Sequence, residues 1–432
     1  MKAQCPFGLM IARSFSILSL FLTLQITARA SNNFAPADYK FPLKVSEDGK
    51  HLADQNDAPF LVVADVAWQL LRKLDYPNAV EYLDIRKSQS FNTILVHVLP
   101  ALPTQKNFHK ITPFQASNEI TKPNQAYFDY LEKVISAAKE RELIIGLVVS
   151  RQSWNMLFET QGEEACRNYG EYIGKRFSKF TNVFWIVSEE ENQKAFVART
   201  LTQSIRANSE NQLIASLSTC TPPDSLDKNA TDLKVFVPDS TVTDSEYAAL
   251  ATWQKNIGTS MKTPFLIANS EFPIKDQSAL IRKQAYESLL SSAAGFCHMS
   301  TIKNFNPTWK VNILRDGGEY MVRFSKILQG IPWALIQPDP VIKLVQDTTQ
   351  TSEITVATIS NHRMAILYIP TAREFKLDLT QLTGNEFRAV WYSPRTGRRW
   401  SGGEFERTNA APIIPPDKQA DWDWILLVGA KN

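Results

Sequence analysis

Residues 126–150 read AYFDYLEKVISAAKERELIIGLVVS. The first part of this stretch places Tyr127, Leu131 and Val134 near helical spacing, which predicts an amphipathic helix. Its last eight residues, LIIGLVVS, form a continuous apolar run without the alternation of a half-exposed strand. Such a run is typical of a strand that is covered on both faces, as in a parallel sheet. The stretch therefore predicts a helix followed by a buried strand.

The same unit recurs along most of the chain. Short apolar runs occupy residues 59–68, 91–100, 143–150, 182–192, 212–219, 232–238, 264–272 and 293–301. Helical patterns lie between most of them, at residues 77–89, 126–143, 163–179, 194–208, 245–258 and 281–293. Eight such units within about 250 to 300 residues favour a (β/α)8 TIM barrel, an α/β fold, over an open doubly wound sheet. No Gly-x-Gly-x-x-Gly turn follows the first run, which weakens the dinucleotide-binding alternative.

The pattern changes after Gly330. Six short strand-like runs follow, at residues 341–347, 353–360, 363–370, 374–380, 387–394 and 423–429, separated by turn residues. The segment IPWALIQPDP, residues 331–340, contains three prolines and is typical of a junction. We expect a barrel domain over residues 31–337 and a small antiparallel β-sandwich domain over residues 338–432.

The first thirty residues have the features of a secretory signal. Lys2 and Arg13 precede the apolar run SFSILSLFLTLQI, and Ala28-Arg29-Ala30 has the small-x-small pattern of a cleavage site. A membrane anchor is the alternative, but the run is shorter than the roughly 20 apolar residues of a membrane span. We therefore expect residues 1–30 to be removed and the protein to be secreted or periplasmic, with no membrane partner afterwards.

Charge and cysteine content exclude several classes of function. Residues 1–30 contain three basic residues and no acidic one, so the rest of the chain has 44 of the 47 basic residues against 44 acidic ones. This balance gives no electrostatic case for binding nucleic acid. Cys166, Cys220 and Cys297 are widely spaced, so we expect buried free thiols, at most one disulfide and no zinc site. No metal or other cofactor is predicted.

Polar residues at the ends of the predicted strands are the candidates for a site, because function in a TIM barrel lies at the C-terminal ends of the strands. In chain order they are Asp65 and Trp68, His97, Ser150, Arg151 and Trp154, Glu189, Glu190 and Glu191, Asn269, Ser270 and Glu271, and His298, with Trp309 in the following loop. Taken singly, each glutamate could be a solvated strand end, each tryptophan could be packing, and His97 could be a core histidine. Their joint placement at one end of a barrel favours a site.

Two carboxylates after the fourth and seventh strands are the informative pair. Glycoside hydrolysis needs one carboxylic acid to protonate the leaving oxygen and one carboxylate to attack the sugar or to activate water. Retaining barrel glycosidases place these groups after strands four and seven, where this chain has Glu190 and Glu271. Tryptophans at the same rim suit sugars, because the C–H faces of sugars stack on aromatic rings.

The order of these motifs is similar to that of a known family. The segments VSEDGKHLADQNDAPFLVVADVAWQLL, RKSQSFNTILVHVL, YFDYLEKVISAAKERELIIGL, YIGKRFSKFTNVFWIVSEEEN and TPFLIANSEF resemble, in this order, the apiosidase-like glycoside hydrolases of family 140 and their relatives. The tail, with VWYSPRTGR and a closing DWILLVG, resembles the collagen-binding-type β domain that follows in that family. The resemblance covers residues 41–428 and implies a (β/α)8 barrel that removes apiose from branched pectin side chains.

The resemblance also implies roles for individual residues. A Trp-Ile-Leu-Gly-Gly-Asp motif falls on WIVSEE, which places the general acid/base on Glu190, and a Val-Leu-Asp-Gly-Glu type motif places the nucleophile on Glu271 once two residues are inserted. A Gly-Asp-Thr-Ala-Trp motif falls on ADVAW and places Asp65 and Trp68 at the site. Because successive strand side chains point to opposite faces, Glu189 and Glu190 cannot both face inward on a regular strand, and a one-residue slip would exchange them.

The predicted function is a secreted, retaining glycoside hydrolase that acts on a plant-type or other complex polysaccharide as a monomer. Glu190 and Glu271 would be catalytic. The predicted substrate contacts are Asp65, Trp68, His97, Arg151, Trp154, Glu189, His298 and Trp309. Two alternatives stay open: an inactive carbohydrate-binding barrel, and an adhesion protein that acts through its β domain.

Overall fold

A computed structural model describes residues 39–117, 119–188, 193–219, 231–237, 263–269, 277–338, 342, 344–346, 354–359, 362–419 and 421–431. The predicted signal, the predicted helix at 245–258, Cys220 and the candidates Glu189, Glu190, Glu191, Ser270 and Glu271 lie outside these residues.

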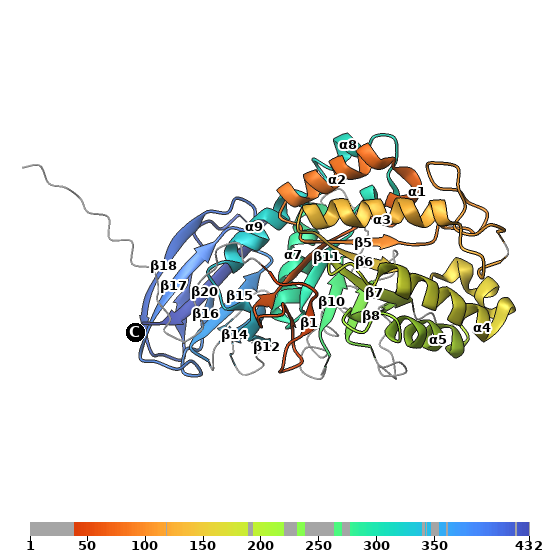
Figure 1. Cartoon of the computed structure of the whole chain (residues 1–432). Coiled ribbons are helices and arrows are strands. Elements are labelled where there is room, and N and C mark those ends of the chain that lie inside the picture. Colours follow the sequence, from red (N-terminus) through yellow and green to blue (C-terminus); the bar gives the residue numbers. More distant parts are fainter. Residues whose placement is uncertain are drawn as a thin grey trace, which may run out of the picture. The chain divides into compact units, whose positions relative to one another are not determined.

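Eight parallel strands close into a barrel, which confirms the predicted fold (Figure 1). They are β4 (Val62–Val66), β5 (Thr93–His97), β6 (Ile144–Val148), β7 (Val183–Ser188), β8 (Ile214–Thr219), β9 (Leu233–Val237), β10 (Phe265–Ala268) and β11 (Gly295–His298). Each strand pairs in parallel with its neighbours along the chain, and β11 pairs with β4 to complete the ring. Each of the eight apolar runs of the sequence contains one of these strands.

The strands bury both of their faces, which is why their sequences are continuously apolar. One face fills the barrel interior with residues such as Leu95, Phe184 and Ile186, and the other packs under the helices with residues such as Val96 and Trp185. Gly146 on β6 gives room to the interior layer, since a Cβ atom there would lie 2.5 Å from Leu95 Cδ2 and 2.7 Å from Phe184 Cζ.

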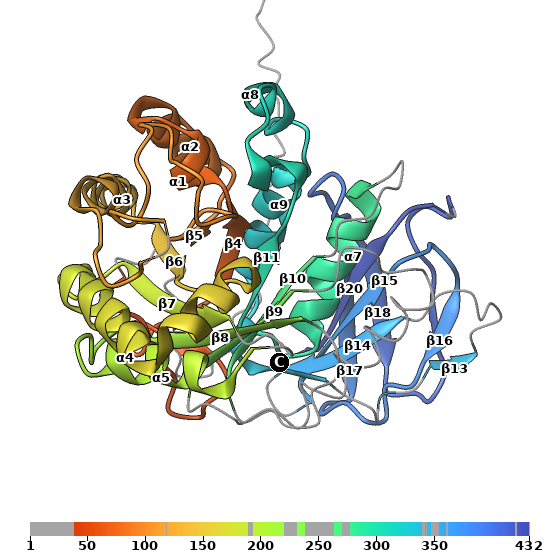
Figure 2. The same ribbon diagram turned by 90° about the vertical axis from the view of Figure 1, so that its right-hand side faces the viewer.

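Helices surround the strands (Figure 2). They are α1 (Leu70–Lys73), α2 (Tyr76–Ser88), α3 (Gln125–Glu140), α4 (Gln152–Phe177), α5 (Ala195–Arg206), α7 (Gln277–Leu290), α8 (Trp309–Asn312) and α9 (Gly318–Leu328), with 3-10 turns η1 (Thr301–Asn304) and η2 (Trp333–Leu335). The Asp75 side chain caps α2 by accepting from Asn78 N. Helix α4 starts eleven residues before the predicted helix, because two helical segments join across Gly162, whose φ is 84°. In the part of the chain described, no helix is long and apolar enough to cross a bilayer.

Three very short strands precede the barrel. Strands β1 (Lys44–Val45), β2 (Leu52–Ala53) and β3 (Pro59–Phe60) form an antiparallel sheet that the sequence pattern does not predict. Leu52 and Phe60 from this sheet belong to the same apolar cluster as the barrel interior. The small sheet therefore covers one end of the interior with apolar side chains.

The C-terminal residues form two antiparallel sheets, as predicted. The larger has the order β12 (Ile336–Pro338), β14 (Thr355–Ile359), β15 (Met364–Ile369), β20 (Trp424–Ala430), β17 (Glu386–Tyr392) and β18 (Arg399–Glu406); the smaller contains β13 (Leu344–Gln346), β16 (Phe375–Leu377) and β19 (Ala411–Ile413). Residues of both sheets, among them Leu367, Trp391 and Leu377, share one apolar core. Helix α7 of the barrel packs against β14 and β15, where the rings of Tyr286 and Tyr368 stack 5.6 Å apart.

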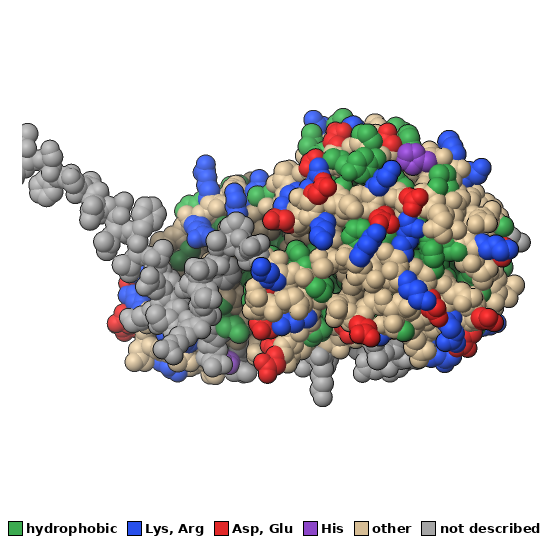
Figure 3. All heavy atoms as spheres, in the orientation of Figure 1, with side chains coloured by type: hydrophobic (Ala, Val, Ile, Leu, Met, Phe, Trp, Pro, Cys, Tyr) green, Lys and Arg blue, Asp and Glu red, His purple; other side chains and the backbone are tan. Residues whose placement is uncertain are grey.

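Charged side chains of both signs are interspersed over the face shown in Figure 3. Between α3 and α4, for example, Arg176 pairs with Asp129 and with Glu132, and Lys179 also pairs with Glu132. This mixing agrees with the near balance of acidic and basic residues in the sequence.

Candidate active site

Trp68 and His97 come together at the C-terminal ends of neighbouring strands. Trp68 follows β4 and packs against the apolar cluster of the barrel interior. His97 is two residues beyond the interior residue Leu95 and therefore lies on the same face of β5. The two rings are 4.4 Å apart between centroids and are inclined by 46°. The structure thus joins two of the predicted substrate contacts into one aromatic patch at the barrel mouth.

Arg151 lies close enough to His97 to influence its charge. It has extended backbone angles, lies three residues after the end of β6 and directly precedes the first residue of α4. Burial lowers the pKa of His97 well below its ordinary value, and the positive charge of Arg151 lowers it further. The Nδ1 atom of His97 is buried and has no hydrogen-bond partner among the described residues. The lowered pKa favours the neutral form of the His97 imidazole at neutral pH.

Ser150 and Ser188 connect the C-terminal ends of the neighbouring strands β6 and β7. The backbone N–H of Ser188 donates to Ser150 Oγ over 3.1 Å, and both residues are buried. Ser188 follows the interior residues Phe184 and Ile186 at a spacing of two, so it lies on the interior face of β7. The predicted carboxylates Glu189, Glu190 and Glu191 come directly after this residue, outside the described part of the chain.

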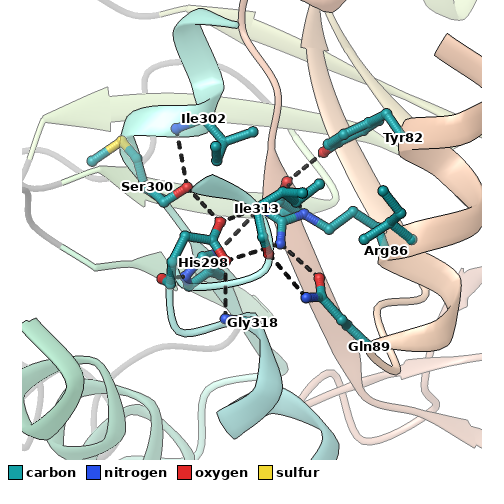
Figure 4. Close-up of polar contacts among 12 residues, drawn as sticks. Tyr82, Arg86, Gln89, His298, Ser300, Ile302, Ile313 and Gly318 are labelled. Carbon is teal, nitrogen blue, oxygen red and sulfur yellow. Dashed lines mark hydrogen bonds and ion pairs between the residues drawn. The ribbon is translucent and has the colours of Figure 1, made fainter. Parts of the chain in front are cut away.

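Asp65 and His298 point away from the barrel interior. Their neighbours Ala64 and Cys297 belong to the interior cluster, so strand alternation directs Asp65 and His298 towards the helices. His298 Nδ1 lies 2.9 Å from Asp65 Oδ1, and both side chains are fully buried. Arg86 Nε donates to Asp65 Oδ2 over 2.8 Å, and the Tyr82 hydroxyl donates to the same oxygen (Figure 4). The structure gives these two residues partners behind the barrel wall, and sugar contact by either stays a prediction.

Asp316 completes this buried cluster from the loop between α8 and α9. Arg86 Nη2 donates to Asp316 Oδ2 over 2.5 Å, and Ser300 Oγ donates to the same oxygen over 2.8 Å. Burial alone would raise the pKa of Asp316, but the charges of Arg86 and His298 and its hydrogen bonds keep it below the ordinary value. From the sequence, we did not predict Arg86 or Asp316. Arg86 could have been found from its position one turn after Tyr82, because a charged residue on the buried face of α2, which also carries Ala79 and Leu83, indicates a buried ion pair.

Trp154 and Trp309 lie in the core around the barrel. Trp154 is fully buried, its indole N–H donates to the Pro100 carbonyl over 2.8 Å, and its ring lies against Phe114. Trp309 packs edge-on against Phe305. Their packing explains both tryptophans as core residues, and their contact with a sugar stays a prediction.

The described residues offer no metal site. Among them there is no group of three His, Cys, Asp or Glu side chains that could hold an ion. Cys166 and Cys297 are free and buried, as predicted, and burial raises the pKa of the Cys166 thiol to about 12. Thiols of this kind are poor nucleophiles and poor ligands at neutral pH.

Comparison with known proteins gives two family matches. The family model described as "Apiosidase-like, catalytic domain" matches residues 46–334. The model described as "Putative collagen-binding domain of a collagenase" matches residues 338–429. The two matches correspond to the barrel and to the antiparallel sheets. No curated protein matches the chain.

Two solved structures that are named as glycoside hydrolases have the same fold. One, named "Glycoside hydrolase", has 19% sequence identity and a TM-score of 0.78, over 90% of this chain and 97% of its own. A glycoside hydrolase family 5 structure from Bacteroides vulgatus has 18% identity and the same TM-score of 0.78, over 90% of this chain and 93% of its own. The likeness extends over both the barrel and the β domain.

Proposed function

The chain belongs to the family of apiosidase-like catalytic domains of glycoside hydrolases, and from this premise we propose that it is an exported retaining glycosidase with Glu190 as general acid/base and Glu271 as nucleophile. Its substrate would be a glycosidic bond of a complex polysaccharide of the plant type. Export would be directed by residues 1–30.

The observation that carries the proposal is the phase of β7. Phe184 and Ile186 belong to the interior cluster, whereas Trp185 and Val187 belong to the cluster under the helices. Ser188 continues the interior series, and if the same alternation holds for two more residues, it would favour Glu190 over Glu189 for the interior. This phase supports the assignment that the family motif gives to Glu190.

The nucleophile is supported in a different way. On β10, Leu266 and Ala268 belong to the interior cluster, so alternation alone would favour residue 270 over residue 271 for the interior. Asn269 is tied to the end of the neighbouring strand β11, since its Nδ2 donates to the Met299 carbonyl over 2.8 Å and its Oδ1 accepts from Met299 N over 2.5 Å. The role of Glu271 therefore depends on the family motif and is the part of the proposal that most needs a direct test.

The proposed reaction has two steps. Glu190 first protonates the glycosidic oxygen while Glu271 attacks the anomeric carbon and forms a glycosyl-enzyme. Glu190 then removes a proton from water, which displaces Glu271 and releases the sugar with retained configuration. This mechanism requires carboxyl groups about 5 to 5.5 Å apart, whereas inversion requires about 6.5 to 9.5 Å.

Trp68, His97 and Arg151 are the sugar contacts that the described geometry favours. The partly exposed indole of Trp68 offers a face for the C–H groups of a sugar ring. His97 is half-buried beside Trp68, and its neutral imidazole has one nitrogen that accepts and one that donates, so it can exchange a hydrogen bond with a sugar hydroxyl. These contacts would hold the sugar without adding negative charge beside the two carboxylates.

The proposal is tested by assaying the protein without residues 1–30 on pectic oligosaccharides, with and without apiose branches, and on hemicellulosic ones. Wild type should release sugar, and Glu190→Gln and Glu271→Gln should lose most of the activity. Azide added to Glu271→Ala with an activated glycoside should give the inverted glycosyl azide, and added to Glu190→Ala the retained one, because azide replaces a different group in each variant. Full activity of both Gln variants would refute the assignment, and binding without release by wild type would favour the carbohydrate-binding alternative.

A further inference from the structure

The hydrogen bonds of His298 define its protonation state. Its Nδ1 faces the Asp65 carboxylate at 2.9 Å, and its Nε2 faces the backbone carbonyl of Asp316 at 3.0 Å. A carbonyl can only accept a hydrogen bond, and a carboxylate that already accepts from Tyr82 and Arg86 is also an acceptor. Both ring nitrogens must then carry hydrogen, which makes the ring an imidazolium.

The charges of the cluster support the same state. Asp65 and Asp316 contribute two negative charges, and Arg86 supplies one positive charge that contacts both of them. All three side chains are at most 3% exposed, so a net charge would be costly. A positive His298 brings the sum to zero, whereas a neutral His298 leaves one uncompensated negative charge in the protein interior.

A chain of contacts leads from this cluster to the aromatic patch at the barrel mouth. Ser300 Oγ donates to Asp316 and also accepts from Ile302 N, which caps η1. The backbone N–H of Gln69 in turn donates to the carbonyl of Lys303 in η1, over 2.9 Å. Gln69 is the residue directly after Trp68.

From this geometry we propose that His298 is a buried imidazolium that positions Trp68, and that the substrate-binding side of the mouth is held in place only while His298 is protonated. The second half of the proposal rests on the function proposed above. His298 is a positioning residue and not a catalytic one, because its side chain points away from the barrel interior and contacts Asp65 and Asp316 behind the barrel wall.

The groups that face His298 all affect its titration in a definable way. They are Asp65 from β4, Arg86 from α2 and Asp316 from the loop before α9. Burial lowers the pKa of His298, but the Asp65 hydrogen bond and the charges of Asp316 and Asp65 outweigh it, so the pKa is raised above its ordinary value. The stabilisation is then complete below about pH 6.5 and is lost as the pH rises through the higher folded-state pKa.

Nitrogen NMR on protein labelled at histidine tests the imidazolium without any substrate. The chain has five histidines, so His298 can be assigned by elimination with the variants at positions 51, 97, 109 and 362, even if a variant at 298 does not fold. At pH 7 the two ring nitrogens of His298 should resonate together in the region of N–H nitrogens. One nitrogen shifted far downfield, as in a neutral ring, would overturn the proposal.

Unfolding and kinetics test the positioning role. With His298→Gln as reference, the folding equilibrium constant of wild type should fall by up to about tenfold per pH unit between about pH 6.5 and the folded-state pKa, and level off above it, and His109→Gln should follow wild type. His298→Gln should raise KM by up to about tenfold with little change in kcat, the range expected for an aromatic contact. An unchanged KM in the folded variant would refute the link to Trp68. If no glycan is cleaved at any pH, the proposed function fails, while the NMR and unfolding results still decide the imidazolium.

Discussion

The guanidinium of Arg282 on α7 donates two hydrogen bonds to the carboxylate of Asp423 in the β domain, from Nε over 2.8 Å and from Nη2 over 3.0 Å. The Tyr368 hydroxyl donates to the same carboxylate over 3.1 Å, and Arg395 lies 3.2 Å from it. Arg282 and Asp423 are 5% and 2% exposed, so the contact between barrel and β domain has a buried ionic centre. Removing the main partner of this buried carboxylate would leave its charge uncompensated and would lower the free energy of unfolding.

Replacing Arg282 should therefore destabilise the whole protein. Arg282→Met leaves the buried Asp423 with only part of its compensation, and we expect a loss of about 3 to 5 kcal/mol in the free energy of unfolding. Arg167→Met is a matched control, because Arg167 pairs with Glu163 at side-chain exposures of 49% and 47% and should change the stability by less than about 1 kcal/mol. Denaturant unfolding measures both, and similar small losses in the two variants would show that the domains do not depend on this pair.

The sequence predicts the barrel well because its strands carry a strong signal. Each strand is buried on both faces, so a run such as LIIGLVVS differs clearly from the amphipathic helices around it. The two-residue strands β1, β2 and β3 were missed because they are too short for any periodicity. The early start of α4 was missed because Gly162 interrupts the helical pattern.

The same uniform burial limits what the sequence says about the site. It places Asp65 and His298 at strand ends, but the residues before them are apolar on both faces, so the direction of each side chain is not encoded in the pattern. The structure supplies that phase and turns both residues towards Arg86 and Asp316. Trp154 is the opposite case, because its spacing of four from Phe158 on α4 does indicate a buried face, and both are fully buried.

Alanine at Gly295 should test how tightly the barrel closes between β11 and β4. A Cβ atom at this position would lie 2.2 Å from the Val62 carbonyl oxygen and 2.5 Å from Val62 Cβ, so the two strands would have to separate. We expect Gly295→Ala to lose about 1 to 3 kcal/mol or more in thermal or denaturant unfolding. Gly330→Ala is the control, because nothing lies within 4 Å of the added atom. Equal stability of the two variants would contradict the observed packing.

Single substitutions of the three glutamates should locate the acid/base. If the phase of β7 continues past Ser188, Glu190→Gln should lower kcat/KM by about 10² to 10⁴, the usual contribution of a general acid. Glu189→Gln and Glu191→Gln should stay within about tenfold of wild type, since neither would donate the proton. A glycoside with a good leaving group should restore much of the kcat/KM of Glu190→Gln, because such a leaving group departs without being protonated. If Glu189→Gln shows this behaviour instead, the strand slips by one residue after Ser188.

His97 should titrate in the opposite sense to His298. Its folded-state pKa lies well below its ordinary value, because of burial and secondarily because of Arg151. Below about pH 6.5 the unfolded chain binds a proton at His97 and the folded protein does not. The contribution of His97 to the free energy of unfolding is therefore fully present above about pH 6.5, and it falls below that pH by up to about 1.4 kcal/mol per pH unit. Comparison with His97→Gln isolates this loss from that of the carboxylates, and the exposed His109 provides the control variant.

Arg151→Gln separates the two causes of this shift. Removing the charge should raise the pKa of His97 only in part, because burial is the larger cause and remains. Proton NMR of the His97 ring between pH 4 and 8 measures the change in both proteins. A midpoint near 6.5 in wild type would mean that water or a mobile partner solvates the ring, and it would remove the basis for a neutral imidazole that receives a sugar hydroxyl beside Trp68.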